Sequence, residues 1–138
     1  MLDTTEKHPE AGALNGLSLA FIGDSVYELL VREYLLRNGS LQIGKLHSLA
    51  VKLVRASAQA HFFDIAEPIL DESELSILHR GRNASSSHAP KGACAIEYRK
   101  ATGVESLFGW LYLEGRQERI RELFDLLLNN LPEGVSEI

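Results

Sequence analysis

Two acidic residues interrupt apolar stretches of the sequence, and their positions are the ones most able to bind a cation. Asp24 and Glu105 each lie among apolar neighbours that read as buried helix. Burying an unpaired carboxylate costs several kcal/mol, so each acid should have a cation, an arginine or a set of hydrogen-bond donors as its partner. A purely structural interpretation, in which Arg32 or Arg99 neutralises an acid, stays open at this point.

A glycine accompanies each of these acids. Gly23 directly precedes Asp24, and Gly109 lies about one helical turn after Glu105. Glycine costs about 1 kcal/mol relative to alanine in a helix interior, so its presence indicates close approach of another backbone or of a ligand. Carboxylate oxygens on rigid helices suit Mg²⁺, which keeps several waters and needs few protein ligands. We therefore predict that Asp24 and Glu105 form a Mg²⁺ site.

The elements that must position these acids are all helices. Apolar residues recur with a spacing near 3.6 and strand-like alternation is nearly absent, which predicts an all-α helical bundle. The expected helices begin at an Asn15 N-cap and run to about residue 37, follow Gly44 to a break near 56–58, and cover 59–66. Three more are expected over about 71–81, 95–113 and 117–129. The small, polar and basic residues of 82–92 predict a loop.

The length of 138 residues fits one domain, and we expect a flexible tail over 1–13, a catalytic domain over 14–130 and a C-terminal tail over 131–138. Every long apolar run contains an acid, which argues against a membrane span. The polar N-terminus does not resemble a secretory signal, and a single cysteine, Cys94, cannot form an internal disulfide. These features favour a cytoplasmic protein.

The charge is unevenly distributed along the chain. The net charge of −5 is unfavourable for nucleic-acid binding. Between residues 75 and 104, however, the sequence has only one acid, Glu97, and many basic residues. This segment includes the predicted loop. Its basic residues are Arg80, Arg82, Lys91, Arg99 and Lys100, with His79 and His88. Such a segment is either a solvated face or an anion-binding site.

Five segments in order resemble the ribonuclease III family. Phe-Ile-Gly-Asp-Ser-Val at 21–26 resembles the second half of its signature helix, and Val-Glu-Ser-Leu-Phe-Gly at 104–109 resembles its second acidic motif. The segments 46–59, 80–84 and 98–102 resemble the short branch, Mini-ribonuclease III, which lacks a separate double-stranded-RNA-binding domain. Ribonuclease III proper has further acids where this chain has Leu17, Ala20 and Thr102. The short branch lacks them too, and whether a second cation is held stays open.

The resemblance implies a homodimeric, Mg²⁺-dependent endoribonuclease that cleaves double-stranded RNA and leaves 5′-phosphate and 3′-hydroxyl ends. Asp24 and Glu105 would be the catalytic and metal-binding residues. The implied biological substrate is the precursor of 23S ribosomal RNA, with a ribosomal protein as a further candidate partner. Phe21 resembles an apolar residue that contacts the partner subunit, although it also reads as an ordinary core phenylalanine.

We expect two sets of residues to contact RNA, because Arg and Lys suit phosphates while Asn, Gln and Ser suit 2′-hydroxyls. The first is the basic loop, with Arg80, Arg82, Asn83, His88 and Lys91. The second lies near the expected helix break and comprises Lys52, Arg55, Ser57 and Gln59. For each residue the simpler interpretation is a solvated surface position.

Two alternatives from other classes remain. A non-catalytic RNA-binding or ribosome-assembly protein could keep the same fold, although it has no evident need for two desolvated acids. A helical phosphohydrolase acting on small phosphates would need a closed pocket and more His or Asp ligands than the sequence offers.

Overall fold

The chain is built from helices, which confirms the predicted all-α class. The computed structural model describes residues 10–38, 42–84, 91–132 and 134–135. Over this part it contains no strand, and its elements are the 3-10 helices η1 (Ala11–Ala13) and η2 (Glu67–Ile69) and the α-helices α1 (Gly16–Arg37), α2 (Ile43–Val54), α3 (Ala56–Ala66), α4 (Glu72–Asn83), α5 (Ala93–Leu113) and α6 (Gln117–Leu128).

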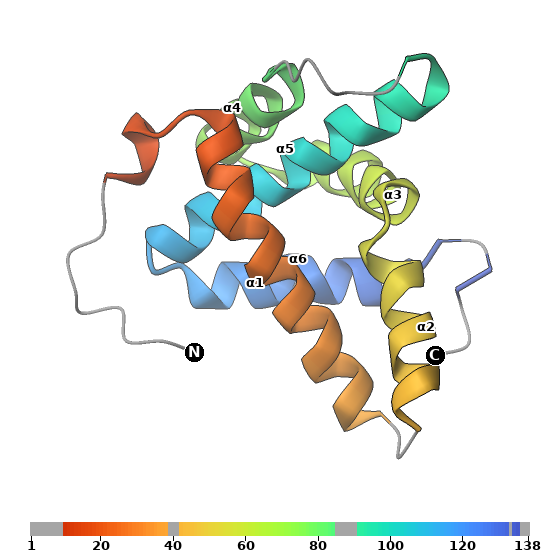
Figure 1. Ribbon diagram of the computed structural model, residues 1–138. Coiled ribbons are helices and arrows are strands. Elements are labelled where there is room, and N and C mark those ends of the chain that lie inside the picture. The colour runs from red at the N-terminus through yellow and green to blue at the C-terminus, as the bar shows by residue number, and fades with distance from the viewer. Residues whose placement is uncertain (1–9, 39–41, 85–90, 133, 136–138) are drawn as a thin grey trace.

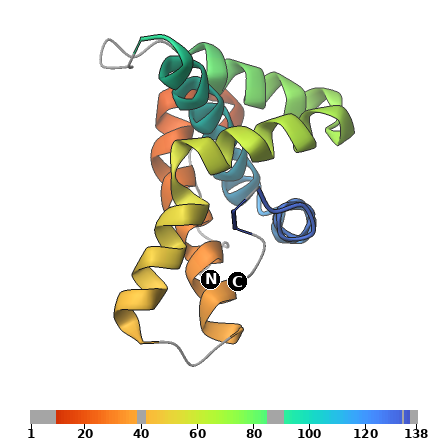
Figure 2. The ribbon, with the colours of Figure 1, turned by 90° about the vertical axis from the view of Figure 1, so that its right-hand side faces the viewer.

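Helix α5 is the centre of the bundle. It contacts α1, α3, α4 and α6, and α1 crosses it at a steep angle (Figure 1). The C-terminal half of α1 lies beside α2, and this pair of helices projects away from the other helices (Figure 2). The core includes edge-to-face aromatic contacts between Tyr27 and both Phe108 and Phe124. Ala11 and Val135, which fall in the predicted tails, are also buried against the core.

The close approach of α1 to α5 depends on two glycines. A Cβ atom on Gly23 would overlap the backbone carbonyl of Glu105, and one on Gly109 would overlap the carbonyl of Leu19. Only a hydrogen atom fits at either position. The glycines beside the two acids therefore allow another backbone to approach, which is one of the two roles that the sequence indicated.

The predicted Asn15 N-cap of α1 agrees with the structure, whereas α2, α3, α4 and α5 differ from their expected bounds by one to three residues. Asn15 caps α1, because its Oδ1 accepts a hydrogen bond from the backbone N–H of Ser18 at 2.8 Å. Helix α2 ends at Arg55, whose ψ of 157° breaks the helix just before the expected position. Helix α4 continues past Gly81 to Asn83, since Gly81 packs against Gly103 and Ser106 in place of ending the helix.

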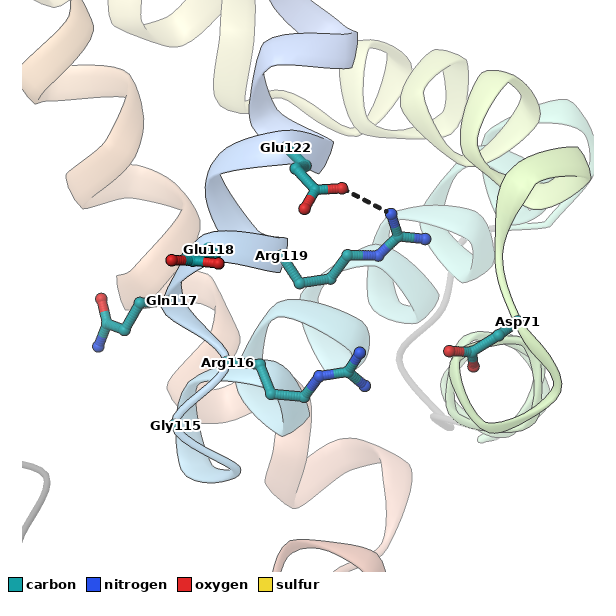
Figure 3. A pocket seen from close by; sticks show the side chains of 7 residues that line it. All are labelled: Asp71, Gly115, Arg116, Gln117, Glu118, Arg119 and Glu122. Atoms are coloured by element: carbon teal, nitrogen blue, oxygen red, sulfur yellow. Dashed lines mark hydrogen bonds and ion pairs between the residues drawn. The ribbon is translucent and has the colours of Figure 1, made fainter.

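A buried ion pair joins α4 to α6. The Glu74 carboxylate has 0% exposed side-chain surface and accepts hydrogen bonds from Arg119 Nε at 2.7 Å and Nη2 at 2.9 Å. Figure 3 shows the surface cavity of about 610 Å³ beside this pair, where Arg116 and Arg119 extend toward the start of α4. Neither Asp24 nor Glu105 lines this cavity, and its arginines are already engaged by Glu74.

Candidate active site

Asp24 and Glu105 meet where α1 crosses α5. The Glu105 side chain lies within hydrogen-bonding contact of the Asp24 carboxyl group, directly beside the close approach at Gly23. Glu105 is half-buried, whereas Asp24 is exposed in this single subunit. The expectation that both acids are buried is therefore wrong for Asp24: Gly23 packs against α5, and the next side chain along α1 reaches solvent.

The environment of Glu105 favours its protonated form. Burial, followed by the hydrogen bond and the negative charge of Asp24, raises the pKa of Glu105 to about 8, while a hydrogen bond from Gln59 acts in the opposite direction. Two carboxylates that share one site raise each other's cost of ionisation unless a cation joins them. The pair thus has the electrostatics of an incomplete cation site.

No basic side chain neutralises either acid within the described part of the chain. Arg32, one of the two candidates from the sequence, pairs with Glu28 at 3.0 Å. Arg99, the other, is exposed and forms no ion pair with Glu105 or Asp24. The structural interpretation that pairs these acids with Arg32 or Arg99 is therefore wrong for the part of the chain that the structure describes.

The donor set fits a cation that keeps much of its hydration. Two carboxylates supply hard oxygen ligands, and the described residues offer no group of three or more His, Cys, Asp or Glu side chains. A third feature is Gln59 Oε1, which is buried and has no hydrogen-bond partner in the structure. An unsatisfied buried acceptor of this kind is uncommon in native proteins and often marks a missing ion or water.

The predicted RNA contacts at the helix break divide into two groups. Lys52, Arg55 and Ser57 are exposed at the corner between α2 and α3. We call these three residues the α2–α3 corner. Gln59 does not belong with them, because it is only 3% exposed and its Nε2 donates to the Val54 carbonyl at 2.8 Å. The period of the helix turns Gln59 inward, toward Glu105.

The predicted basic loop is mostly the end of a helix in the described residues. Arg82 and Asn83 lie in the last turn of α4, and with Ile96, Arg99 and Lys100 of α5 they line a surface cavity of about 390 Å³. Arg80 is exposed but donates to the backbone carbonyls of Gly12 and Leu14 at 3.0 and 3.2 Å, so part of its role is structural.

The structure describes only one of the two remaining residues that we predicted in the basic loop. Lys91 is exposed, and His88 lies outside the described residues. Arg99 and Lys100 were not in the predicted contact set although they belong to the same basic stretch of sequence. Their position about two turns of α5 beyond the loop could have been anticipated from the helical period.

Phe21 is 85% exposed, which makes the interpretation as a core phenylalanine wrong. Leu17, one turn earlier on α1, is also exposed to 44%. Large apolar side chains adjacent on one helix face are the kind of surface that another protein surface covers. Because only one chain is described, the dimer contact itself stays a prediction.

Comparisons with known proteins agree on one family. The Ribonuclease III domain model matches residues 17–116. A Mini-ribonuclease 3 of Desulfitobacterium hafniense is 49% identical over 81% of this chain and 71% of its own length. Another, from Clostridium tetani, is 39% identical over 88% and 81%. A crystal structure of a Fusobacterium nucleatum protein matches with a TM-score of 0.79 at 28% identity, covering 89% of this chain and 98% of that one.

Proposed function

The chain belongs to the ribonuclease III family of endoribonucleases, and from this premise we propose that it cleaves double-stranded RNA in a Mg²⁺-dependent reaction that leaves 5′-phosphate and 3′-hydroxyl ends. The observation that carries the proposal is the contact between the Asp24 and Glu105 carboxyl groups, which no basic side chain among the described residues neutralises. A scaffold protein has no evident need for such a pair, because the two carboxylates are unfavourable in their ionised forms without a cation.

Asp24 and Glu105 would hold the cation. When bound, Mg²⁺ supplies a water of lowered pKa and neutralises charge on the phosphate oxygens. The residues of the chain contribute rigidity: Gly23 and Gly109 fix α1 against α5, so the separation of the two acids is set by backbone contact. A site positioned by packed helices holds its ligands more tightly than one built on loops.

The substrate surface would be made from polar groups in two regions of the surface. The α2–α3 corner offers two cations and a hydroxyl, while Arg82, Asn83 and Lys91 offer a second set near the start of α5. A-form RNA is recognised mainly through its phosphates and 2′-hydroxyls across the minor groove. These residue types suit such contacts, and the overall charge of −5 leaves the rest of the surface unattractive to RNA.

We further propose that the active form is a homodimer in which Phe21 and Leu17 contact the partner subunit, and that each of its two sites cuts one strand. Their exposure supports this assignment, since a solvated pair of large apolar side chains is unfavourable in a lone subunit. We propose the precursor of 23S ribosomal RNA as the biological substrate, in the cytoplasm, with a ribosomal protein as a candidate partner.

The direct test incubates the purified protein with a long labelled RNA duplex in Mg²⁺ and, separately, in EDTA. Single-stranded RNA and duplex DNA serve as substrate controls. We expect Mg²⁺-dependent fragments from the RNA duplex alone, with 5′-phosphate ends that a phosphatase removes. Binding without cleavage would contradict the proposal and favour the scaffold alternative.

A further inference from the structure

Gln59 is the buried polar side chain that links the carboxylate pair to its surroundings. Its Nε2 donates to the Val54 carbonyl at 2.8 Å, which fixes the orientation of the amide, because a flipped amide would place two oxygens against each other. Its Oε1 is then left with no donor among the described residues. The orientation of this side chain is therefore determined while half of its hydrogen-bonding capacity is unused.

The Gln59 side chain also acts on Glu105. It lowers the pKa of that carboxyl group and so opposes the effects of burial and of Asp24. An amide carries two N–H donors, so Gln59 can contact the Val54 carbonyl and the Glu105 carboxylate at the same time. The buried amide thus connects the end of α2 with the Glu105 side chain.

The anchor of this side chain is itself rigid. The last carbonyls of a helix lack partners within the helix. At the end of α2 these partners come from other helices: the Leu53 carbonyl accepts from Tyr27 Oη of α1 at 2.8 Å, and the Val54 carbonyl accepts from Gln59 of α3. Buried side chains of α1 and α3 therefore both hold the end of α2 in place.

We propose that Gln59 is a positioning residue for the cation site, which orients Glu105 through Nε2 and offers Oε1 to a water bound to the cation. The inference rests on the proposed function, because it assumes that Asp24 and Glu105 bind Mg²⁺. A buried acceptor without a donor is unfavourable, and a hydrated cation brings donors that the described residues do not supply. Residues that orient metal ligands in this way typically change metal affinity 10–100-fold when replaced.

The test measures Mg²⁺ and Mn²⁺ affinity by calorimetry for the unmodified protein and for Gln59→Met, which preserves the length of the side chain and removes its polar atoms. We expect the dissociation constant to rise about 10–100-fold. Ser106→Ala is the matched control. Ser106 follows Glu105 in the chain and is buried like Gln59. Its hydroxyl, however, donates to the Gly16 carbonyl at 2.7 Å, on another face of α5. Its loss should lower stability without changing the affinity for the ion.

A spectroscopic measurement on the unmodified protein covers the case in which Gln59→Met does not fold. The chain has three glutamines, and Gln42 and Gln117 are exposed. In an ¹⁵N-resolved NMR titration with Mg²⁺, we expect the side-chain amide of Gln59 to shift while the other two stay in place. An amide of Gln59 that does not move at saturating Mg²⁺ overturns the inference.

The outcomes separate the two proposals. If the unmodified protein binds ions, Asp24→Asn abolishes binding and Gln59→Met binds as before, the metal site stands and the role of Gln59 is wrong. If the unmodified protein binds no ion, the metal site of the proposed function fails, and the inference fails with it. If the role of Gln59 is purely structural, Gln59→Met will lower the unfolding free energy and leave the dissociation constant for the ion unchanged.

Discussion

At the scale of single residues, Asp24 is the most direct test of the carboxylate pair. It is exposed and makes no ion pair in the described structure, so Asp24→Asn should leave the unfolding free energy within about 0.5 kcal/mol. Cleavage of an RNA duplex should fall by about 100-fold or more, because a cation at the scissile phosphate contributes several kcal/mol. RNA affinity should be largely preserved, which a gel-shift assay in Ca²⁺ would check. Normal cleavage by this variant would refute the metal assignment.

Glu74 is an acid whose role is structural, and the shift of its pKa has the opposite sign to that of Glu105. Burial alone would raise the pKa of Glu74, but the hydrogen bonds from Arg119 and from the Asp71 backbone outweigh it and lower that pKa. A lowered carboxyl pKa contributes stability that is present above its ordinary value of 4.5 and is lost as pH falls through the lowered value. Part of the acid unfolding should therefore belong to this residue.

Glu74→Gln should lower the unfolding free energy by about 3–5 kcal/mol near neutral pH, because Arg119 is left without its buried partner. The dependence of stability on pH should also become flatter below 4.5. Glu122→Gln is the control, since Glu122 also pairs with Arg119 at 3.1 Å but its side chain is 64% exposed, and it should cost less than about 1 kcal/mol. Urea denaturation at several pH values measures both effects, and equal losses in the two variants would contradict this account.

At the scale of elements, the crossing of α1 and α5 depends on positions where no side chain fits. Gly23→Ala would place a Cβ atom on the backbone of Glu105, so the two helices must separate. We expect a loss of at least about 3 kcal/mol in unfolding free energy, near the upper part of the range for point substitutions. At Gly44, by contrast, a Cβ atom meets nothing within 4 Å, and Gly44→Ala should be neutral or stabilising by up to about 1 kcal/mol. Thermal unfolding distinguishes the two, and equal melting temperatures would refute the packing argument.

The same elements show what the sequence could and could not predict. Helix types, the Asn15 cap and the pairing of Asp24 with Glu105 followed from periodicity, capping chemistry and the resemblance, because each depends on local pattern. The inward direction of Gln59 and the exposure of Asp24 depend on how α1, α3 and α5 rotate against one another. Burial of Glu74 depends on Arg119 from a distant helix, and no local pattern records that pairing.

At the scale of the whole molecule, an acidic protein must bind RNA through limited basic areas. Lys52→Ala combined with Arg55→Ala removes the two cations of the α2–α3 corner, which directly precedes Gln59 in the chain. RNA affinity should fall, and the slope of log affinity against log salt should decrease by about one for each lost phosphate contact. Arg37→Ala, at the far end of α1 and paired with Glu33, is the control and should change neither. Unchanged affinity and slope in the double variant would remove this corner from the RNA surface.

The assembly of two subunits would place two such basic areas and two carboxylate pairs on one RNA duplex, and Phe21 tests whether this happens. Phe21→Glu puts a charge on the most exposed large apolar side chain of the described residues, so it should convert a dimer to single subunits without unfolding them. Ile69→Glu is the control, because Ile69 is also exposed but lies in η2, away from α1. Sedimentation velocity gives the mass of each variant, and circular dichroism checks that the helices remain.

A Phe21→Glu protein that sediments as a dimer would show that subunits associate through another surface. If it sediments as single subunits yet cuts single strands within a duplex, cleavage requires one subunit and the dimer serves only to pair the cuts.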